Sequence, residues 1–121
     1  MRIISLLLAL SLFHAPEHAR AAFMDGNALL QSCEVGREDP NFYQESAKCL
    51  FYVVGVTDAS NFFQTAEGID NFLCIPSSAT AGQLRDTVVK FLKDNPAERH
   101  KEASVIVYLS LAGAYPCGIN P

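Results

Sequence analysis

Apolar side chains along this chain recur every third or fourth residue more often than every second residue, which is the spacing of helices. A first short helix is predicted over about residues 27–35, with Asp25 or Asn27 as its cap and Gly36 at its end. A longer second helix follows the turn at residues 37–40. Its apolar stripe consists of Phe42, Cys49, Val53, Val56 and Phe63, widened by Leu50, Tyr52 and Phe62.

The second half of the chain is predicted to contain two or three further helices. Residues 65–78 lose the helical periodicity and form the longest predicted loop. Thr80 and Gln83 match a capping box, in which each side chain satisfies a free backbone donor of the other residue. Asn95 and Pro96 end this helix and can begin a further turn. The inner face of the capped helix carries Leu84, Val88, Phe91 and Leu92.

The last apolar run, residues 105–114, contains valine, isoleucine and tyrosine, which are common in strands. We predict a helix there because the run is long, follows a helical turn and is rich in alanine, with a strand as the alternative. The pattern as a whole predicts an all-α fold, a small domain of four to five helices.

The first 21 residues have the layout of a secretory signal peptide. Arg2 precedes an apolar stretch at residues 3–13, and Ala19 and Ala21 supply the small side chains that a signal peptidase requires. A retained membrane anchor is the alternative, but this stretch falls well short of the roughly 20 residues that span a bilayer as a helix. Cleavage after Ala21 leaves residues 22–121 as one helical domain in the periplasm, with no membrane attachment.

The net charge limits the partners that this domain can bind. The whole chain has 9 basic and 13 acidic residues, and loss of Arg2, Glu17 and Arg20 leaves 7 and 12, a net charge of about −5. Nucleic acids and anionic membranes are bound chiefly through clustered lysine and arginine, so neither is an expected partner. A protein partner or a cationic ligand stays open.

All four cysteines lie in the exported part, where an oxidising compartment favours two disulfides over free thiols. A zinc site is disfavoured because the chain has no CxxC motif and His100 is its one histidine after cleavage. Three pairings are possible. Helices joined by short connections lie antiparallel, which brings the residue before the third helix close to the residue after the fourth. This predicts a Cys74–Cys117 bridge and leaves Cys33 to pair with Cys49.

Few side chains suggest catalysis. His100 lies in a run of charged residues, 98–102, which is typical of a solvated helical turn rather than of a catalytic triad. The acidic residues Glu67, Asp70 and Asp86 are scattered and fix no separation of the kind that glycoside hydrolysis requires. The aromatic residues Phe42, Phe62, Phe63 and Phe91 fit core packing by their spacing. We therefore predict no enzyme activity, no metal and no cofactor.

Six segments of the chain carry a resemblance to a known family. They are GNALLQSCE (26–34), CLFYVVGVTD (49–58), CIP (74–76), TAGQ (80–83), FLKDNP (91–96) and YPC (115–117). In this order they resemble the type VI secretion amidase immunity (Tai-like) proteins. The resemblance implies an all-helical fold with two disulfides, frequent homodimers, and inhibition of a cognate peptidoglycan amidase effector by occlusion of its active-site cleft.

On this resemblance, the expected partner-binding surface is the loop that precedes Cys74, because a projecting loop on a rigid scaffold loses little entropy on binding. Its residues are Glu67, Gly68, Ile69, Asp70 and Asn71. The turn at residues 99–101 is a second candidate. A different class of function, a periplasmic stress or chaperone protein that binds unfolded clients through apolar surface, is the alternative to immunity.

Overall fold

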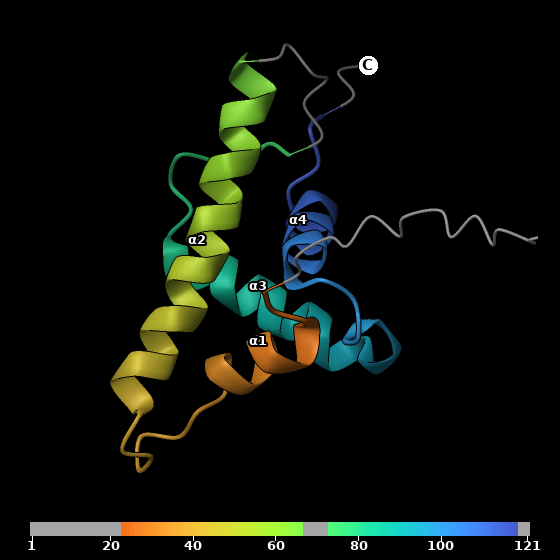
Figure 1. Ribbon diagram of the computed structural model, residues 1–121. Coiled ribbons are helices and arrows are strands. Elements are labelled where there is room, and N and C mark those ends of the chain that lie inside the picture. The colour runs from red at the N-terminus through yellow and green to blue at the C-terminus, as the bar shows by residue number, and fades with distance from the viewer. Residues whose placement is uncertain (1–22, 67–72, 119–121) are drawn as a thin grey trace, which may run out of the picture.

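Within the residues that the structure describes, four α-helices and one turn of 3₁₀-helix form the regular structure (Figure 1). The computed structural model describes residues 23–66 and 73–118. The predicted all-α fold is confirmed in these ranges. The predicted signal peptide, residues 1–21, and the predicted contact loop, residues 67–71, lie outside the described residues. In chain order the elements are α1 (Gly26–Cys33), α2 (Phe42–Ala66), α3 (Ala81–Asp94), η1 (Pro96–Glu98) and α4 (Ala103–Ala114).

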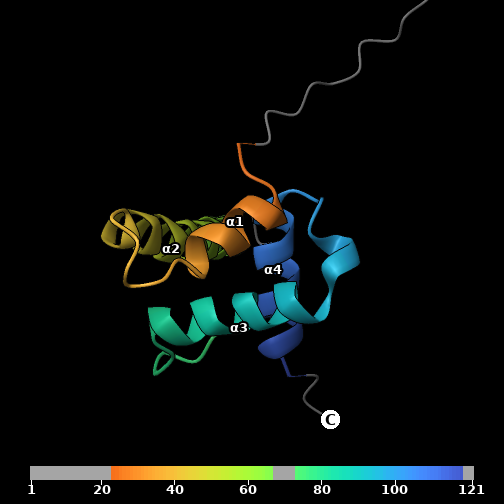
Figure 2. The ribbon, with the colours of Figure 1, turned by 90° about the horizontal axis from the view of Figure 1, so that it is seen from below.

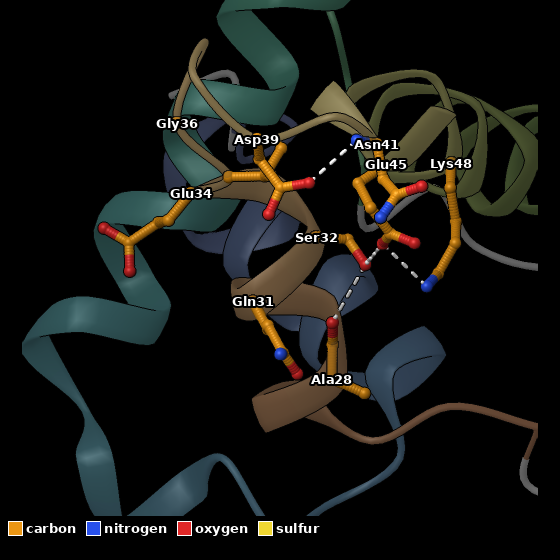
Figure 3. Close-up of a pocket in the computed structure, with 10 residues that line it drawn as sticks. Ala28, Gln31, Ser32, Glu34, Gly36, Asp39, Asn41, Glu45 and Lys48 are labelled. Atoms are coloured by element: carbon orange, nitrogen blue, oxygen red, sulfur yellow. Dashed lines mark hydrogen bonds and ion pairs between the residues drawn. The ribbon is translucent and has the colours of Figure 1, made fainter. Parts of the chain in front are cut away.

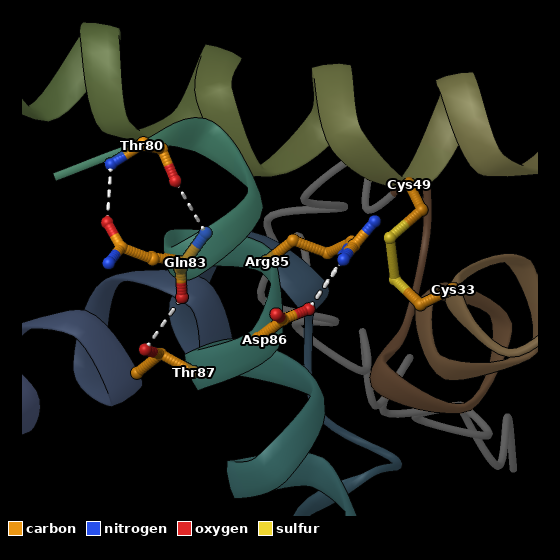
Figure 4. Close-up of polar contacts among 7 residues, drawn as sticks. All are labelled: Cys33, Cys49, Thr80, Gln83, Arg85, Asp86 and Thr87. Atoms are coloured by element: carbon orange, nitrogen blue, oxygen red, sulfur yellow. Dashed lines mark hydrogen bonds and ion pairs between the residues drawn. A yellow bond between two sulfur atoms is a disulfide. The ribbon is translucent and has the colours of Figure 1, made fainter.

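Side-chain caps fix the starts of α1 and α3. The Asp25 carboxylate accepts the backbone N–H of Ala28 at 2.8 Å, so Asp25 is the cap of α1. At α3, the Thr80 hydroxyl accepts the Gln83 N–H at 3.2 Å and the Gln83 side chain accepts the Thr80 N–H at 2.8 Å (Figure 4). The predicted capping box is therefore confirmed.

Helix α2 has 25 residues and packs against each of the other three α-helices. Its buried stripe is Cys49, Val53 and Thr57, at spacings of four residues. The prediction that Phe62 and Phe63 belong to the core is wrong, because these side chains are 63% and 55% exposed. At about 1.5 Å per residue α2 is roughly 37 Å long, and its C-terminal end extends past α3 (Figure 1).

Residues 103–114 are helical, as predicted. Helix α4 crosses α3 steeply, so the predicted antiparallel arrangement of these two helices is wrong (Figure 2). The turn between them is held by α1: the N–H groups of Gly26 and Asn27 donate to the carbonyls of Lys101 and Arg99, both at 3.0 Å. These hydrogen bonds fix the turn from which α4 begins.

The core lies where the four α-helices meet. Its side chains are aliphatic. Burial of apolar surface contributes about 25 cal/mol of free energy per Å², so these residues supply the main stabilisation of a domain of this size. The buried residues that form it are Leu29, Leu30, Val53, Leu73, Leu84, Val88, Leu92, Ala103, Ile106, Val107 and Leu111.

Two disulfides close the structure, with the predicted pairing. Cys33 at the end of α1 is bonded to Cys49 in α2 (Figure 4). Cys74, in the segment before α3, is bonded to Cys117 after α4. The N–H of Cys74 also donates to the carbonyl of Tyr115 at 2.9 Å. The segment that follows residues 67–72 is therefore fixed to the end of α4.

Candidate functional site

A polar pocket lies at the junction of α1 and α2 (Figure 3). It has a volume of about 530 Å³ and lies between the last turn of α1, the connection to α2 and the first two turns of α2. The Cys33–Cys49 bridge ties these two helices together beside it. The polar side chains that line it are Gln31, Ser32, Glu34, Asp39, Asn41, Glu45 and Lys48.

A hydrogen-bonded chain crosses this pocket. The hydroxyl of Ser32 donates to Glu45 Oε2 at 2.6 Å, and Lys48 Nζ donates to the same oxygen at 2.9 Å. The Ser32 hydroxyl, followed by the Lys48 ammonium, lowers the pKa of the Glu45 carboxyl below its ordinary value of 4.5. Ser32 is 1% exposed, so its hydroxyl positions the carboxylate and cannot reach a substrate as a nucleophile.

The substitution Glu45→Gln should make stability less dependent on pH. Because the pKa of Glu45 is lowered in the folded state, the ionised carboxylate stabilises the fold above its ordinary pKa of 4.5, and that stabilisation disappears as the pH falls through the folded value. The variant should be less stable than the wild type at pH 7, with a gap that closes toward pH 3. Urea unfolding at pH 7, 5, 4 and 3 measures this gap, with Glu38→Gln on the adjacent loop as the control. A gap that stays constant over this range would contradict the assignment.

Ion pairing ties the rim of the pocket to the opposite side of the bundle. Glu34, just after α1, pairs with Lys93 in the last turn of α3. Both side chains are about half exposed, so this pair contributes at most about 1 kcal/mol. The pocket is therefore rigid mainly through the disulfide and the Ser32 hydrogen bond, and its walls can present fixed polar groups to another macromolecule.

An apolar groove lies between α2 and α4. It has a volume of about 360 Å³, and none of its lining residues carries a formal charge. The residues that line the groove are Val56, Ala59, Ser60 and Phe63 from α2, and Ser104, Val105, Tyr108 and Leu109 from α4.

Tyr52 lies on the same helix α2 but does not line the groove. Burial raises the pKa of its phenol above the ordinary value of 10.0, and the phenol is neutral at physiological pH.

The described residues hold no group of three or more His, Cys, Asp or Glu side chains that could bind a metal ion. Within the same ranges, no helix is both long and apolar enough to cross a membrane. His100 is exposed on the turn after η1. The described part of the chain therefore offers two surfaces, the polar pocket and the apolar groove.

The sequence-predicted contact residues fall in two places. Residues 67–71 lie outside the described part of the chain, between the end of α2 at Ala66 and the buried Leu73. In the second candidate, the turn at residues 99–101, the Arg99 side chain is already engaged: its Nε donates to the carbonyl of Leu92 at 2.6 Å. Arg99 therefore caps the end of α3, while His100 and Lys101 remain exposed.

The polar pocket and the apolar groove were not predicted from the sequence. Ser32 and Glu45 are 13 residues apart and carry no local motif. The available signal was their position beside the disulfide, since Ser32 precedes Cys33 and Glu45 lies one helical turn before Cys49. For the groove, the signal was the absence of any charged residue from residues 103–114.

Together these features define a small, disulfide-bonded helical protein with one polar pocket and one apolar groove on its described surface. Its family is shown by a family model of the Rap1a immunity proteins, which matches residues 25–117. The chain belongs to this family, which is one of type VI secretion immunity proteins. Searches of curated proteins and of solved structures found no match.

Proposed function

We propose that this protein is a periplasmic immunity protein that binds a peptidoglycan amidase effector of type VI secretion and occludes its active site. The observation that carries the proposal is the match to the Rap1a immunity family over residues 25–117. An immunity family implies a cognate effector, and the resemblance of the six segments 26–34, 49–58, 74–76, 80–83, 91–96 and 115–117 to amidase immunity proteins supplies the proposed class of that effector.

The proposed mechanism is steric and needs no catalytic group, metal or cofactor on this chain. An inhibitor that fills a cleft must keep its shape, since ordering a flexible segment on binding costs free energy. Two disulfides and a core shared by all four α-helices supply that rigidity. The inhibitor then acts by excluding peptidoglycan from the amidase.

We propose the periplasm as the site of action because disulfides form and persist in oxidising compartments. Peptidoglycan, which is the substrate of the proposed partner, lies in the periplasm. The predicted removal of residues 1–21 would release residues 22–121 there as one domain. We also propose that this domain acts as a homodimer, as the resemblance implies.

The loop at residues 67–71 is the proposed contact with the amidase cleft. The chain that follows it is well anchored: Leu73 is 4% exposed, and Cys74 is bonded to Cys117. A loop held at this end loses less entropy on entering a cleft than one that is free at both ends.

Titration of the exported domain against purified type VI peptidoglycan amidases, beginning with any that is encoded beside its gene, tests this proposal. The wild type should abolish peptidoglycan hydrolysis at an equimolar ratio. The double substitution Asp70→Ala and Asn71→Ala should raise the inhibition constant about 100-fold, the effect of losing two or three good interface contacts. The matched control is His100→Ala combined with Lys101→Ala on the second exposed candidate surface.

Three outcomes separate the alternatives. An unchanged inhibition constant for the loop variant, with a raised one for the control variant, would move the contact to residues 99–101. A wild type that leaves the amidase fully active would refute the proposed function. Protection of unfolded client proteins from aggregation at low pH, without inhibition of the amidase, would favour the chaperone function.

A further inference from the structure

The apolar groove between α2 and α4 belongs to a larger exposed surface. Val105 and Leu109, one helical turn apart on α4, are 43% and 52% exposed. Phe63 on α2 is 55% exposed, and its ring lies against that of Phe62 at a centroid distance of 5.5 Å with edge-to-face geometry. These four side chains form one apolar strip along two helices, which we call the α2/α4 strip.

Helix α4 has the composition of a helix that is covered on every side. Residues 103–114 contain no charged side chain, and a helix that is apolar around its whole circumference is typically buried. In the monomer one face of α4 packs into the core through Ile106, Val107 and Leu111, while Val105 and Leu109 face solvent. A single copy of the chain therefore leaves this helix half covered.

The exposed apolar area matches what a stable protein interface requires. A standard interface buries about 800 Å² of each partner. About 57% of that surface is apolar, which corresponds to roughly 450 Å². From their exposed fractions, the four side chains of the α2/α4 strip present on the order of 400 Å² of apolar surface. The other residues that line the groove, which include Tyr108, supply the remainder.

The charge distribution favours a second copy of this chain as the occupant. Two identical acidic proteins repel each other, and a symmetric contact contains every charge of the contacting surface twice, once from each copy. The α2/α4 strip and the groove contain no acidic or basic residue, so this face avoids that repulsion. Val105 and Leu109 form the α4 wall of the groove, and such a ridge of side chains packing into a groove is the usual contact between helices.

We infer that two copies of this protein associate through the α2/α4 strip, with the ridge of each copy seated in the groove of the other. This inference rests on the proposed homodimer and assigns its surface. It places the dimer contact away from the polar pocket at the junction of α1 and α2, which stays accessible to other partners.

Sedimentation equilibrium of the exported domain tests the inference with a matched pair of variants. Leu109→Glu puts two carboxylates into the proposed contact, one from each copy, and should raise the dimer dissociation constant at least 100-fold. Phe51→Glu is the control, since Phe51 is 70% exposed on α2 but does not line the groove, and it should leave the dimer intact. Leu109→Ser is a milder second variant, and far-UV circular dichroism checks that all three variants are folded.

The outcomes distinguish the surface from the proposed function. A dimeric Leu109→Glu variant, or a monomeric wild type, overturns the inference, and only the second result also overturns the homodimer. If Leu109→Glu instead loses inhibition of the amidase while it remains dimeric, the strip belongs to the effector and the inference fails. If the wild type is monomeric and the Leu109→Glu variant no longer protects client proteins from aggregation, the strip binds unfolded proteins. Amidase inhibition by a wild type that does not dimerise would leave the immunity function standing.

Discussion

Replacing Gly26 by alanine should lower the free energy of unfolding by about 3 kcal/mol, because there is no room for a methyl group where α1 meets the turn before α4. A Cβ atom at Gly26 would lie 2.5 Å from Ile106 Cδ1 and 2.8 Å from the backbone oxygen of Arg99. The isoleucine tip can turn away, but the Arg99 oxygen is fixed, since it accepts the N–H of Asn27 at 3.0 Å. The methyl group must therefore separate α1 from the turn that it holds in place.

Urea unfolding of the Gly26→Ala variant, followed by circular dichroism, measures this change, with an accompanying fall in melting temperature of roughly 15 °C. The matched control is Gly55→Ala in α2, where an added Cβ meets nothing within 4 Å. That substitution should stabilise the protein by about 1 kcal/mol, because alanine is the better helix former. A loss below 1 kcal/mol at Gly26 would mean that the backbone at Arg99 yields easily, and the close approach would then have no structural role.

The features that the sequence predicted best are those decided by chemistry within a few residues. The capping box of Thr80 and Gln83 and the Asp25 cap depend on side chains that reach their own backbone. Helix rather than strand at residues 103–114 also followed from local composition. The close approach at Gly26 carries no such signal, since its partners lie more than 70 residues away along the chain.

The disulfide pairing was predicted correctly from a helix arrangement that is only partly correct. Cys74 and Cys117 meet because the segment before α3 runs beside the end of α4. There the backbone N–H of Cys74 donates a hydrogen bond to the carbonyl of Tyr115. They do not meet through antiparallel packing of α3 and α4 (Figure 2). The order of the cysteines and helices along the chain was enough to favour this pairing. It carries no information on the angle at which α4 crosses α3.

The buried face of α2 was the least predictable element. This helix carries apolar residues on nearly every side, and the predicted stripe joined Cys49 and Val53 with Val56 and Phe63. Tertiary packing buries Cys49 and Val53 with Thr57, whose hydroxyl donates to the carbonyl of Val53 at 2.8 Å. Val56 is only partly buried and Phe63 is exposed, and both lie in the α2 wall of the apolar groove.

Reduction of the two disulfides should remove most of the stability of the fold. On the chain-entropy model, a bridge that spans 16 residues contributes about 3 kcal/mol and one that spans 43 residues about 4 kcal/mol. Their sum is comparable to the total stability of roughly 5–15 kcal/mol that small domains have. We expect a reducing agent such as TCEP to lower the urea midpoint by more than half, and an unchanged midpoint would show that the helices hold together without the bridges.

The two bridges should differ in their effect on inhibition. Cys74→Ala with Cys117→Ala releases the segment next to residues 67–71 from the end of α4, whereas Cys33→Ala with Cys49→Ala loosens the polar pocket instead. Both pairs cost several kcal/mol, and Cys49 is fully buried, so its removal adds a packing loss of about 1–2 kcal/mol to the smaller loop term. The two variants should thus be similarly stable and can be compared at a temperature where both are folded.

If the contact loop requires a fixed anchor, the Cys74/Cys117 variant should lose inhibition of the amidase at least tenfold more than the Cys33/Cys49 variant. Equal losses would place the effector contact elsewhere on the protein.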